Sequence, residues 1–301
     1  MPSWQGKSRG NTTGFRIFVW TLKYAGLRPA YFLLRFVALY FFIFSGRAFH
    51  YQFIFFRKRL GFSLLKTCGS IYKNYYWFGQ TIIDKIVLMS GMKHPFRFEF
   101  EGEAHLHEMV NQNKGGLLLS AHIGNWEIAG YLLKRLGTDM HIVMYDGEQQ
   151  QIKDYLESIT GKHTARIILI REDLSHIYAI QEALDKNAFV CMHADRFLEG
   201  NKTNTAVLLN KPAAFPAGPF LLGYTFRSPV SFVFAMKDRA FDYHYYASPS
   251  KIYTGQRENA VSEMLGAYIR EMEQMIRRYP LQWYNYYDFW NDDSPLLVTR
   301  K

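Results

Sequence analysis

Cysteine is scarce in this chain, and its scarcity limits the chemistry that the chain can perform. Only Cys68 and Cys191 occur among 301 residues, so the sequence offers no disulfide framework, and both are expected to be free thiols in a reducing compartment. Their spacing does not suit metal binding, and no other set of ligand residues has suggestive spacing. We therefore predict no metal and no cofactor.

Long uncharged runs are also missing. The longest near the N-terminus covers residues 36–46, and Arg35 interrupts the apolar segment before it. A spanning helix needs about 20 apolar residues, and basic residues flank this segment on both sides, so they do not orient a span. No small-residue cleavage site of a secretory signal follows. We predict an interfacial or shallowly embedded anchor, with one short span as the alternative.

Acidic residues are nearly absent from residues 1–94. This part has 14 Lys or Arg and one acid, Asp84, a net charge of +13, whereas the rest has 22 basic and 25 acidic residues, a net charge of −3. Such a segment suits nucleic acid or an anionic membrane. Its many interleaved aromatic side chains favour lipid, so we predict an anionic membrane surface as partner and no nucleic acid. We divide the chain into a basic, aromatic-rich helical membrane-anchoring arm, residues 1–94, and an α/β domain, residues 95–301.

The hydrophobic pattern predicts an α/β fold. In the arm, helical spacing predicts a helix over 63–90, and alternation after Pro95 predicts a strand over 96–100. Short apolar strands then alternate with helices, which is typical of a largely parallel central sheet flanked by helices. We expect strands at 116–121, 140–145, 166–170, 188–192, 206–209, 230–235 and 240–246, and helices at 125–136, 148–159, 174–185, after Pro216 and at 258–279.

One strand-to-helix junction carries a base and a carboxylate. His122 and Glu127 belong to the sequence His-Ile-Gly-Asn-Trp-Glu and, on one helix, would lie about 140° apart. With Asn125 as N-cap and a fold-back at Gly124, Glu127 would reach a ring nitrogen of His122, leaving the other nitrogen as a general base. The alternative is a structural histidine bonded to backbone beside a solvated glutamate.

Three later segments add candidates. Asp195 and Arg196 follow the strand at 188–192, so they should lie at the same sheet edge as His122. Asp195 would orient a substrate, pair with Arg196, or form a surface salt bridge; His193 and Asp195 lack a third metal ligand. Residues 208–220, which include Gly218, are suited to closing a groove around an aliphatic chain, or simply pack. The aromatic residues 283–290 cover that groove, anchor at the interface or belong to the core.

These residues resemble the bacterial late acyltransferases of lipid A synthesis, the lauroyl and myristoyl transferases. The block from His122 to Glu127 matches that family's His-x-Gly-x-Trp-Glu block closely. Asp195 corresponds to a family Asp that is usually followed by Gln, whereas Arg196 follows it here. Residues 208–210 resemble the family's Phe-x-Gly turn, with Asn210 at the left-handed position. A family Arg falls near 161–166, where Arg166 is available.

The resemblance implies a glycerolphosphate-acyltransferase-like fold and an acyltransferase activity. An acyl chain would pass from an acyl carrier protein or coenzyme A thioester to a hydroxyl of a lipid A-type glycolipid or related membrane lipid, at the cytoplasmic face of the bacterial inner membrane. His122 would be the base and Glu127 its partner, with oxyanion donors at the helix N-terminus near Asn125 and no acyl-enzyme. The predicted substrate-binding residues are Asn125, Trp126, Arg166, Asp195, Arg196 and Gly218.

Three alternatives remain open from the sequence. An acyl thioesterase would use the same base with water as acceptor. The same machinery would also serve an aminolipid or a lipid-linked pigment. A non-enzymatic membrane or nucleic-acid binding protein would use the arm alone.

Overall fold

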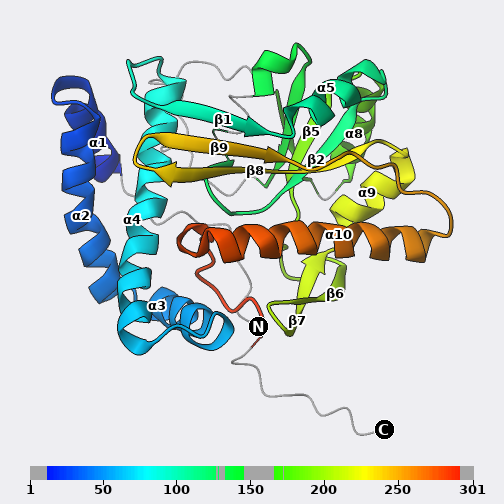
Figure 1. Cartoon of the computed structure of the whole chain (residues 1–301). Coiled ribbons are helices and arrows are strands. Elements are labelled where there is room, and N and C mark those ends of the chain that lie inside the picture. The colour runs from blue at the N-terminus through cyan, green and yellow to red at the C-terminus, as the bar shows by residue number, and fades with distance from the viewer. Residues whose placement is uncertain (1–11, 127, 129–132, 146–165, 172, 292–301) are drawn as a thin grey trace, which may run out of the picture.

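The computed structural model describes residues 12–126, 128, 133–145, 166–171 and 173–291. Their centre is a sheet of seven strands in the order β1-β9-β8-β2-β5-β3-β4 (Figure 1). The strands are β1 (Arg97–Glu101), β2 (Gly116–Ser120), β3 (Met140–Met144), β4 (Arg166–Leu169), β5 (Phe189–His193), β8 (Val230–Arg239) and β9 (Asp242–Ala247). The flanking helices are α5 (Glu103–Asn111), α8 (Ser175–Asp185), α9 (Gly218–Phe226) and α10 (Arg257–Arg278), with short 3₁₀ turns at Leu133–Leu136 and Pro280–Gln282.

The predicted largely parallel α/β sheet is confirmed. Strands β8, β2, β5, β3 and β4 run parallel, and every residue of β2 is buried, as expected for a strand covered on both faces. β9 returns antiparallel beside β8, and β1 runs parallel to β9. The likeness to glycerolphosphate acyltransferases stays a prediction.

The arm is a group of helices beside the sheet. It comprises α1 (Thr12–Tyr24), α2 (Leu27–Phe44), α3 (Gly46–Phe53), a π-helical segment at Ile54–Arg59 and α4 (Leu64–Met89). The predicted helix 63–90 is confirmed, because Ser63 caps α4 by accepting a hydrogen bond from the Lys66 amide (3.4 Å) and the helix ends before Ser90. Phe55 and Phe56 are buried in the same hydrophobic cluster as the sheet side chains, so the arm and the sheet share a core.

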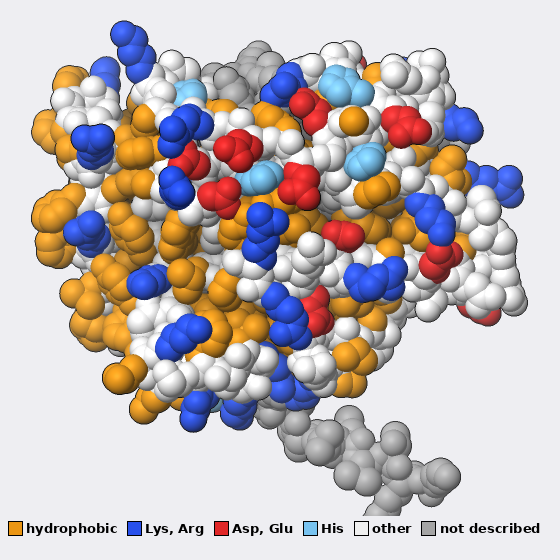
Figure 2. Space-filling view, in the orientation of Figure 1, with side chains coloured by type: hydrophobic (Ala, Val, Ile, Leu, Met, Phe, Trp, Pro, Cys, Tyr) orange, Lys and Arg blue, Asp and Glu red, His pale blue; other side chains and the backbone are white. Residues whose placement is uncertain are grey.

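The outer side of the arm is apolar and exposed. Figure 2 shows hydrophobic side chains with Lys and Arg spaced among them on this side. By length and composition alone α2 is apolar enough to cross a membrane, although the same test is passed by core helices and signal sequences. Most of its side chains are outside the protein core. We call this set the apolar arm face; its members are Ile17, Trp20, Tyr24, Phe32, Phe36, Leu39, Tyr40, Ile43, Phe44, Leu64 and Leu65.

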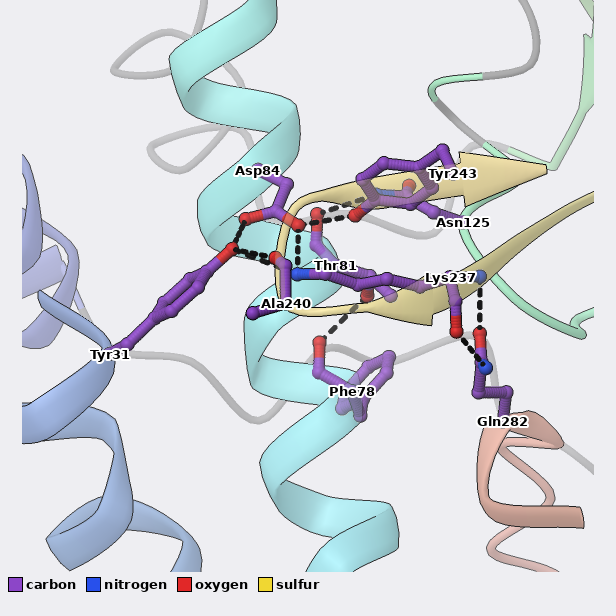
Figure 3. A network of polar contacts seen from close by, with 9 residues as sticks. All are labelled: Tyr31, Phe78, Thr81, Asp84, Asn125, Lys237, Ala240, Tyr243 and Gln282. Carbon is purple, nitrogen blue, oxygen red and sulfur yellow. Dashed lines mark hydrogen bonds and ion pairs between the residues drawn. The ribbon is translucent and has the colours of Figure 1, made fainter. Parts of the chain in front are cut away.

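A buried ion pair joins the arm to the sheet. Asp84 of α4 accepts a hydrogen bond from Lys237 of β8 (Nζ–Oδ2 2.6 Å), and both side chains are inaccessible to solvent (Figure 3). The hydroxyls of Tyr31, from α2, and Tyr243, from β9, also donate to Asp84. Burial raises the pKa of Asp84 and lowers that of Lys237, while each partner's charge opposes the shift. The only acid of residues 1–94 therefore fixes α2 and α4 against the sheet.

The segment after β5 contains one strand more than predicted. The predicted strand at 206–209 is confirmed as β6 (Thr203–Leu208), and β7 (Lys211–Pro216), which was not predicted, pairs with it in an antiparallel hairpin. Its turn has positive φ at Leu209 (50°) and Asn210 (64°), which confirms the left-handed conformation predicted at Asn210. The prolines of β7 obscured the strand, but a two-stranded hairpin has edges that tolerate them.

The aromatic end of the chain packs in the core. Trp283 is fully buried, with its ring 4.8 Å from that of Phe55 and 5.1 Å from that of Phe289. Of the three interpretations of residues 283–290, core packing fits this segment. The predicted helix 148–159 lies outside the described residues.

Candidate active site

Two parallel strands bring His122 and Asp195 to one sheet edge. Ser120, which ends β2, is in register with His193, which ends β5, and the Ala194 amide donates to the Ser120 carbonyl (2.9 Å). Two residues beyond each partner lie His122 and Asp195. The predicted meeting of these two segments is confirmed.

Both carboxylate oxygens of Asp195 contact His122. Oδ1 lies 2.8 Å from His122 Nδ1, and Oδ2 accepts the His122 backbone N–H at 3.0 Å. The carboxylate is 1% exposed, whereas the imidazole keeps 14% exposure at the edge of the sheet. Burial alone would raise the pKa of Asp195, but the charge and hydrogen bond of His122, together with Arg196, outweigh burial and hold that pKa well below its ordinary value. An ionised Asp195 places the proton of the neutral imidazole on Nδ1, so Nε2 carries no proton and can accept one.

The turn after His122 is fixed by backbone hydrogen bonds. The Gly124 amide donates to the Gln282 carbonyl (2.8 Å), the Asn125 amide donates to the Ala235 carbonyl (2.7 Å), and the Tyr284 amide donates to the His122 carbonyl (3.2 Å). Gly124 has φ +66°, which glycine adopts readily. The His122 backbone is thus held from both sides before any ligand arrives.

Aromatic rings surround the imidazole. The Trp126 ring centroid lies 5.0 Å from that of His122, and His193 lies 4.3 Å from it. Burial, reinforced by the charge of His122, lowers the pKa of His193 well below its ordinary value, so His193 is neutral. Because its pKa is low, His193 does not compete for the proton that His122 would accept.

Arg196 closes the far side of Asp195. Its Nη2 donates to the Tyr284 carbonyl (2.6 Å), its Nε lies 3.9 Å from Asp195 Oδ2, and its guanidinium lies 5.7 Å from the Tyr287 ring centroid. Arg196 therefore supports Asp195 and ties it to the C-terminal segment. Of the three interpretations of Asp195, the pairing with Arg196 is confirmed, and the surface salt bridge is wrong because the carboxylate is buried. None of the three included the contact with His122.

The family model for bacterial lipid A biosynthesis acyltransferases matches residues 70–290. The chain belongs to this family. It is an acyltransferase, and the family implies an acyl donor and a lipid acceptor in general. No curated protein matches the chain closely enough to count as a relative.

The remaining predicted site residues of this acyltransferase differ in their placement. Trp126 lines the site, whereas the Asn125 side chain is buried beneath the turn, where its Nδ2 donates to the Thr81 carbonyl (3.3 Å) and the Tyr243 hydroxyl (3.2 Å). Glu127 lies outside the described residues, so its pairing with His122 stays a prediction.

Arg166 is not brought to His122, and Gly218 lies at the start of a helix. Arg166 begins β4, at the sheet edge opposite the one that carries His122, and β4 is three strands away from β2. Gly218 begins α9, directly after the β6–β7 hairpin, and is exposed. Sequence order gave no means of separating these residues from the true neighbours of His122.

The structure narrows the choice of oxyanion donors near Asn125. The amides of Gly124 and Asn125 already donate to protein carbonyls, so they are not available to a ligand. Trp126 is the next residue and the first one of the helical turn. Among the described residues no carbonyl accepts its amide, so this donor is the candidate that the turn leaves.

Neither a metal nor a thiol nucleophile is favoured in this acyltransferase. Within the described ranges no group of three or more His, Cys, Asp or Glu is arranged to hold a metal ion. Burial raises the pKa of the Cys191 thiol to about 12, so it stays protonated near neutral pH. The contact between His122 and Asp195 is therefore the candidate for proton transfer in the described site.

We predict that Gly124→Ala damages both stability and acyl transfer. A Cβ at Gly124 would lie 2.2 Å from the Ala235 carbonyl oxygen, so the turn that carries His122 must move. The left-handed conformation costs a non-glycine residue roughly 1–2 kcal/mol, and overpacking adds about 1–3 kcal/mol. Chemical unfolding and the kcat of acyl transfer measure the two effects.

Gly91→Ala is the matched control. Gly91 has φ +67°, and a Cβ there meets no atom within 4 Å. It should therefore show the conformational cost alone, with unchanged kcat. Equal losses of stability in the two variants, with full activity in both, would contradict the close packing at Gly124.

Proposed function

We propose that this protein transfers a fatty acyl chain from an acyl carrier protein or coenzyme A thioester to a hydroxyl of a lipid A-type glycolipid or related membrane lipid. The bidentate contact between Asp195 and His122 carries this proposal, because it holds an imidazole in the form that a general base requires. The proposed location is the cytoplasmic face of the bacterial inner membrane.

His122 would act at the acceptor hydroxyl. Its Nε2 takes the hydroxyl proton as the acceptor oxygen attacks the thioester carbonyl carbon, while ionised Asp195 stabilises the imidazolium. The tetrahedral intermediate then collapses, the carbon–sulfur bond breaks, and the imidazolium returns its proton to the leaving thiolate. The acyl chain ends on the acceptor oxygen without an acyl-enzyme.

The developing oxyanion needs a donor that is not already used. The Trp126 amide is the proposed donor, because the preceding amides of Gly124 and Asn125 donate to protein carbonyls. In other acyl-transfer enzymes one such donor lowers the activation barrier by about 3 kcal/mol. Glu127 is proposed as a second carboxylate at the same turn.

The apolar arm face supports membrane docking. Large hydrophobic side chains on α1, α2 and the start of α4 face solvent, with Arg28 and Arg35 among them. An exposed patch of this composition suits the boundary between headgroups and acyl chains, where arginine reaches anionic phosphates. The proposed binding mode is interfacial, with Arg35 directed toward the headgroups.

The deciding experiment separates acyl transfer from hydrolysis. The purified full-length protein is incubated with an acyl thioester, first alone and then with a lipid A precursor, an aminolipid or another hydroxyl lipid, and products are followed by mass spectrometry. We expect a lipid heavier by one acyl chain and slow release of free acid. Fast release of free acid without acceptor, unchanged when lipid is added, would instead identify a thioesterase.

A further inference from the structure

A basic cavity lies between the arm and the β8–β9 turn, apart from the His122 site. It has a volume of about 740 Å³, within the range of small-ligand pockets. Four cations line it: Arg28 and Arg35 of α2, Lys73 of α4, and Arg239 at the end of β8. Arg28 and Arg35 precede the part of the chain that the family model matches.

These cations form no ion pair within the part of the chain that the structure describes, and no Asp or Glu is among the described lining residues. Two acids lie close by, but each has another cation as its ion-pair partner. Asp84, which Tyr31 of the lining contacts, pairs with Lys237, and Asp242, whose charge interacts with that of Arg239, pairs with Arg97 (2.7 Å). The cavity wall therefore carries an excess of positive charge, which favours an anion.

Gln80 adds a polar group inside the cavity. Its side chain is 4% exposed, and its Oε1 is buried with no hydrogen-bond partner among the described residues. A buried acceptor without a donor is costly, and a ligand hydroxyl would satisfy it. Tyr76 and Trp77 supply apolar walls beside it. The lining thus suits a phosphate with a neighbouring hydroxyl group.

The position of the cavity indicates where such a ligand comes from. Phe32 belongs both to the lining and to the apolar arm face, so the cavity opens at the border of the surface proposed to enter the bilayer interface. An arginine guanidinium group binds phosphate through two parallel hydrogen bonds, and a lysine ammonium group adds a positive charge. We infer that this cavity binds the anionic, phosphate-bearing headgroup of a membrane lipid.

The cavity is also connected to the catalytic turn. Gln80 and Thr81 are consecutive in α4; Gln80 lines the cavity, and the Thr81 carbonyl accepts a hydrogen bond from Asn125, three residues after His122. Leu281 lines the cavity, and the next residue, Gln282, accepts the Gly124 amide. A headgroup held here would anchor the protein with the His122 turn next to the interface.

Vesicle binding by the full-length protein tests this inference, which rests on membrane docking but not on catalysis by His122. Flotation uses vesicles of phosphatidylcholine alone and of phosphatidylcholine mixed with phosphatidylglycerol. The variant R28Q/R35Q/K73Q/R239Q should lose about 10³-fold in affinity for the mixed vesicles, since each of the four cations contributes about 1 kcal/mol near an anionic surface and about 1.4 kcal/mol is tenfold in affinity. Affinity for phosphatidylcholine alone should change little, because its headgroup has no net charge and the apolar arm face is intact.

Two controls make the result specific. K114Q/R171Q/K202Q/R257Q removes the same charge from exposed positions on the α/β part and should keep the preference for phosphatidylglycerol. Ala240→Trp fills the cavity from the β8–β9 turn without changing charge and should abolish that preference. Equal losses in both quadruple variants, or no effect of Ala240→Trp, would overturn the inference.

A soluble competitor distinguishes a lipid headgroup from a free phosphate compound. Glucose 1-phosphate should weaken binding to mixed vesicles only at concentrations far above those of the lipid, and glucose should have no effect. Cavity-dependent binding of glucose 1-phosphate with no cavity-dependent vesicle binding would overturn the assignment to lipid. His122→Ala should bind vesicles as the wild type does, so a failure of acyl transfer is separable from a failure of this inference.

Discussion

Replacing His122 by alanine is expected to lower kcat/KM for acyl transfer by about 10²–10⁴-fold, the usual contribution of a general base. Asp195→Asn should have an effect of the same order, because an amide does not hold the Nδ1 proton as a carboxylate does. The two losses should not add, since both side chains serve one proton transfer. Steady-state kinetics with an acyl thioester and a hydroxyl lipid measure all three variants, H122A, D195N and H122A/D195N.

Glu127→Gln is the informative comparison. Asp195 Oδ1 lies 2.8 Å from His122 Nδ1, so D195N should be impaired whatever the role of Glu127. Circular dichroism must show that each variant is folded, because Asp195 is buried and its loss also costs stability. Full activity of a folded D195N would refute the pairing as the source of the base, and a severe loss in E127Q alone would assign that part to Glu127.

The site around Asp195 shows which features local sequence patterns can predict. The strand ends at 120 and 193 were predictable, because short apolar runs bounded by polar residues mark buried strands. The rule that parallel strands share a carboxyl edge then placed His122 and Asp195 together. The same reasoning chose Glu127 as the partner, since it lies five positions from His122 whereas Asp195 lies 73 positions away. Sequence patterns indicated the edge of the sheet but not which carboxylate contacts the ring.

The choice of Arg166 has the same origin. Arg166 was selected for its place in the chain, between the two motifs, and the sheet order β2-β5-β3-β4 moves it away from His122. The arm helix α4 was predicted almost to the residue, because helical spacing and its Ser63 cap are local. The reversal of β9 and β1 depends on pairing between distant strands, which periodicity does not encode.

Removing either member of the buried Asp84–Lys237 pair should give the largest loss of stability in this protein. Asp84→Asn or Lys237→Met leaves the other charge buried, at a cost of about 3–5 kcal/mol in the free energy of unfolding. The sequence marked Asp84 only as the lone acid of the arm, because its partner is 153 positions away. Equilibrium unfolding of the full-length protein in detergent measures the losses.

The double variant D84L/K237M distinguishes a charge effect from lost packing. With both charges gone it should recover most of the stability that either single variant loses, although the hydroxyls of Tyr31 and Tyr243 then lose their shared acceptor. The exposed pair Lys251–Glu263 is the matched control, and Lys251→Met should cost at most about 1 kcal/mol. Single and double variants at Asp84 and Lys237 that fall within the range of this control would show that the pair does not hold the arm. If the pair does hold it, D84N should also reduce kcat, because Tyr243 links Asp84 to Asn125 and so to the turn that carries His122.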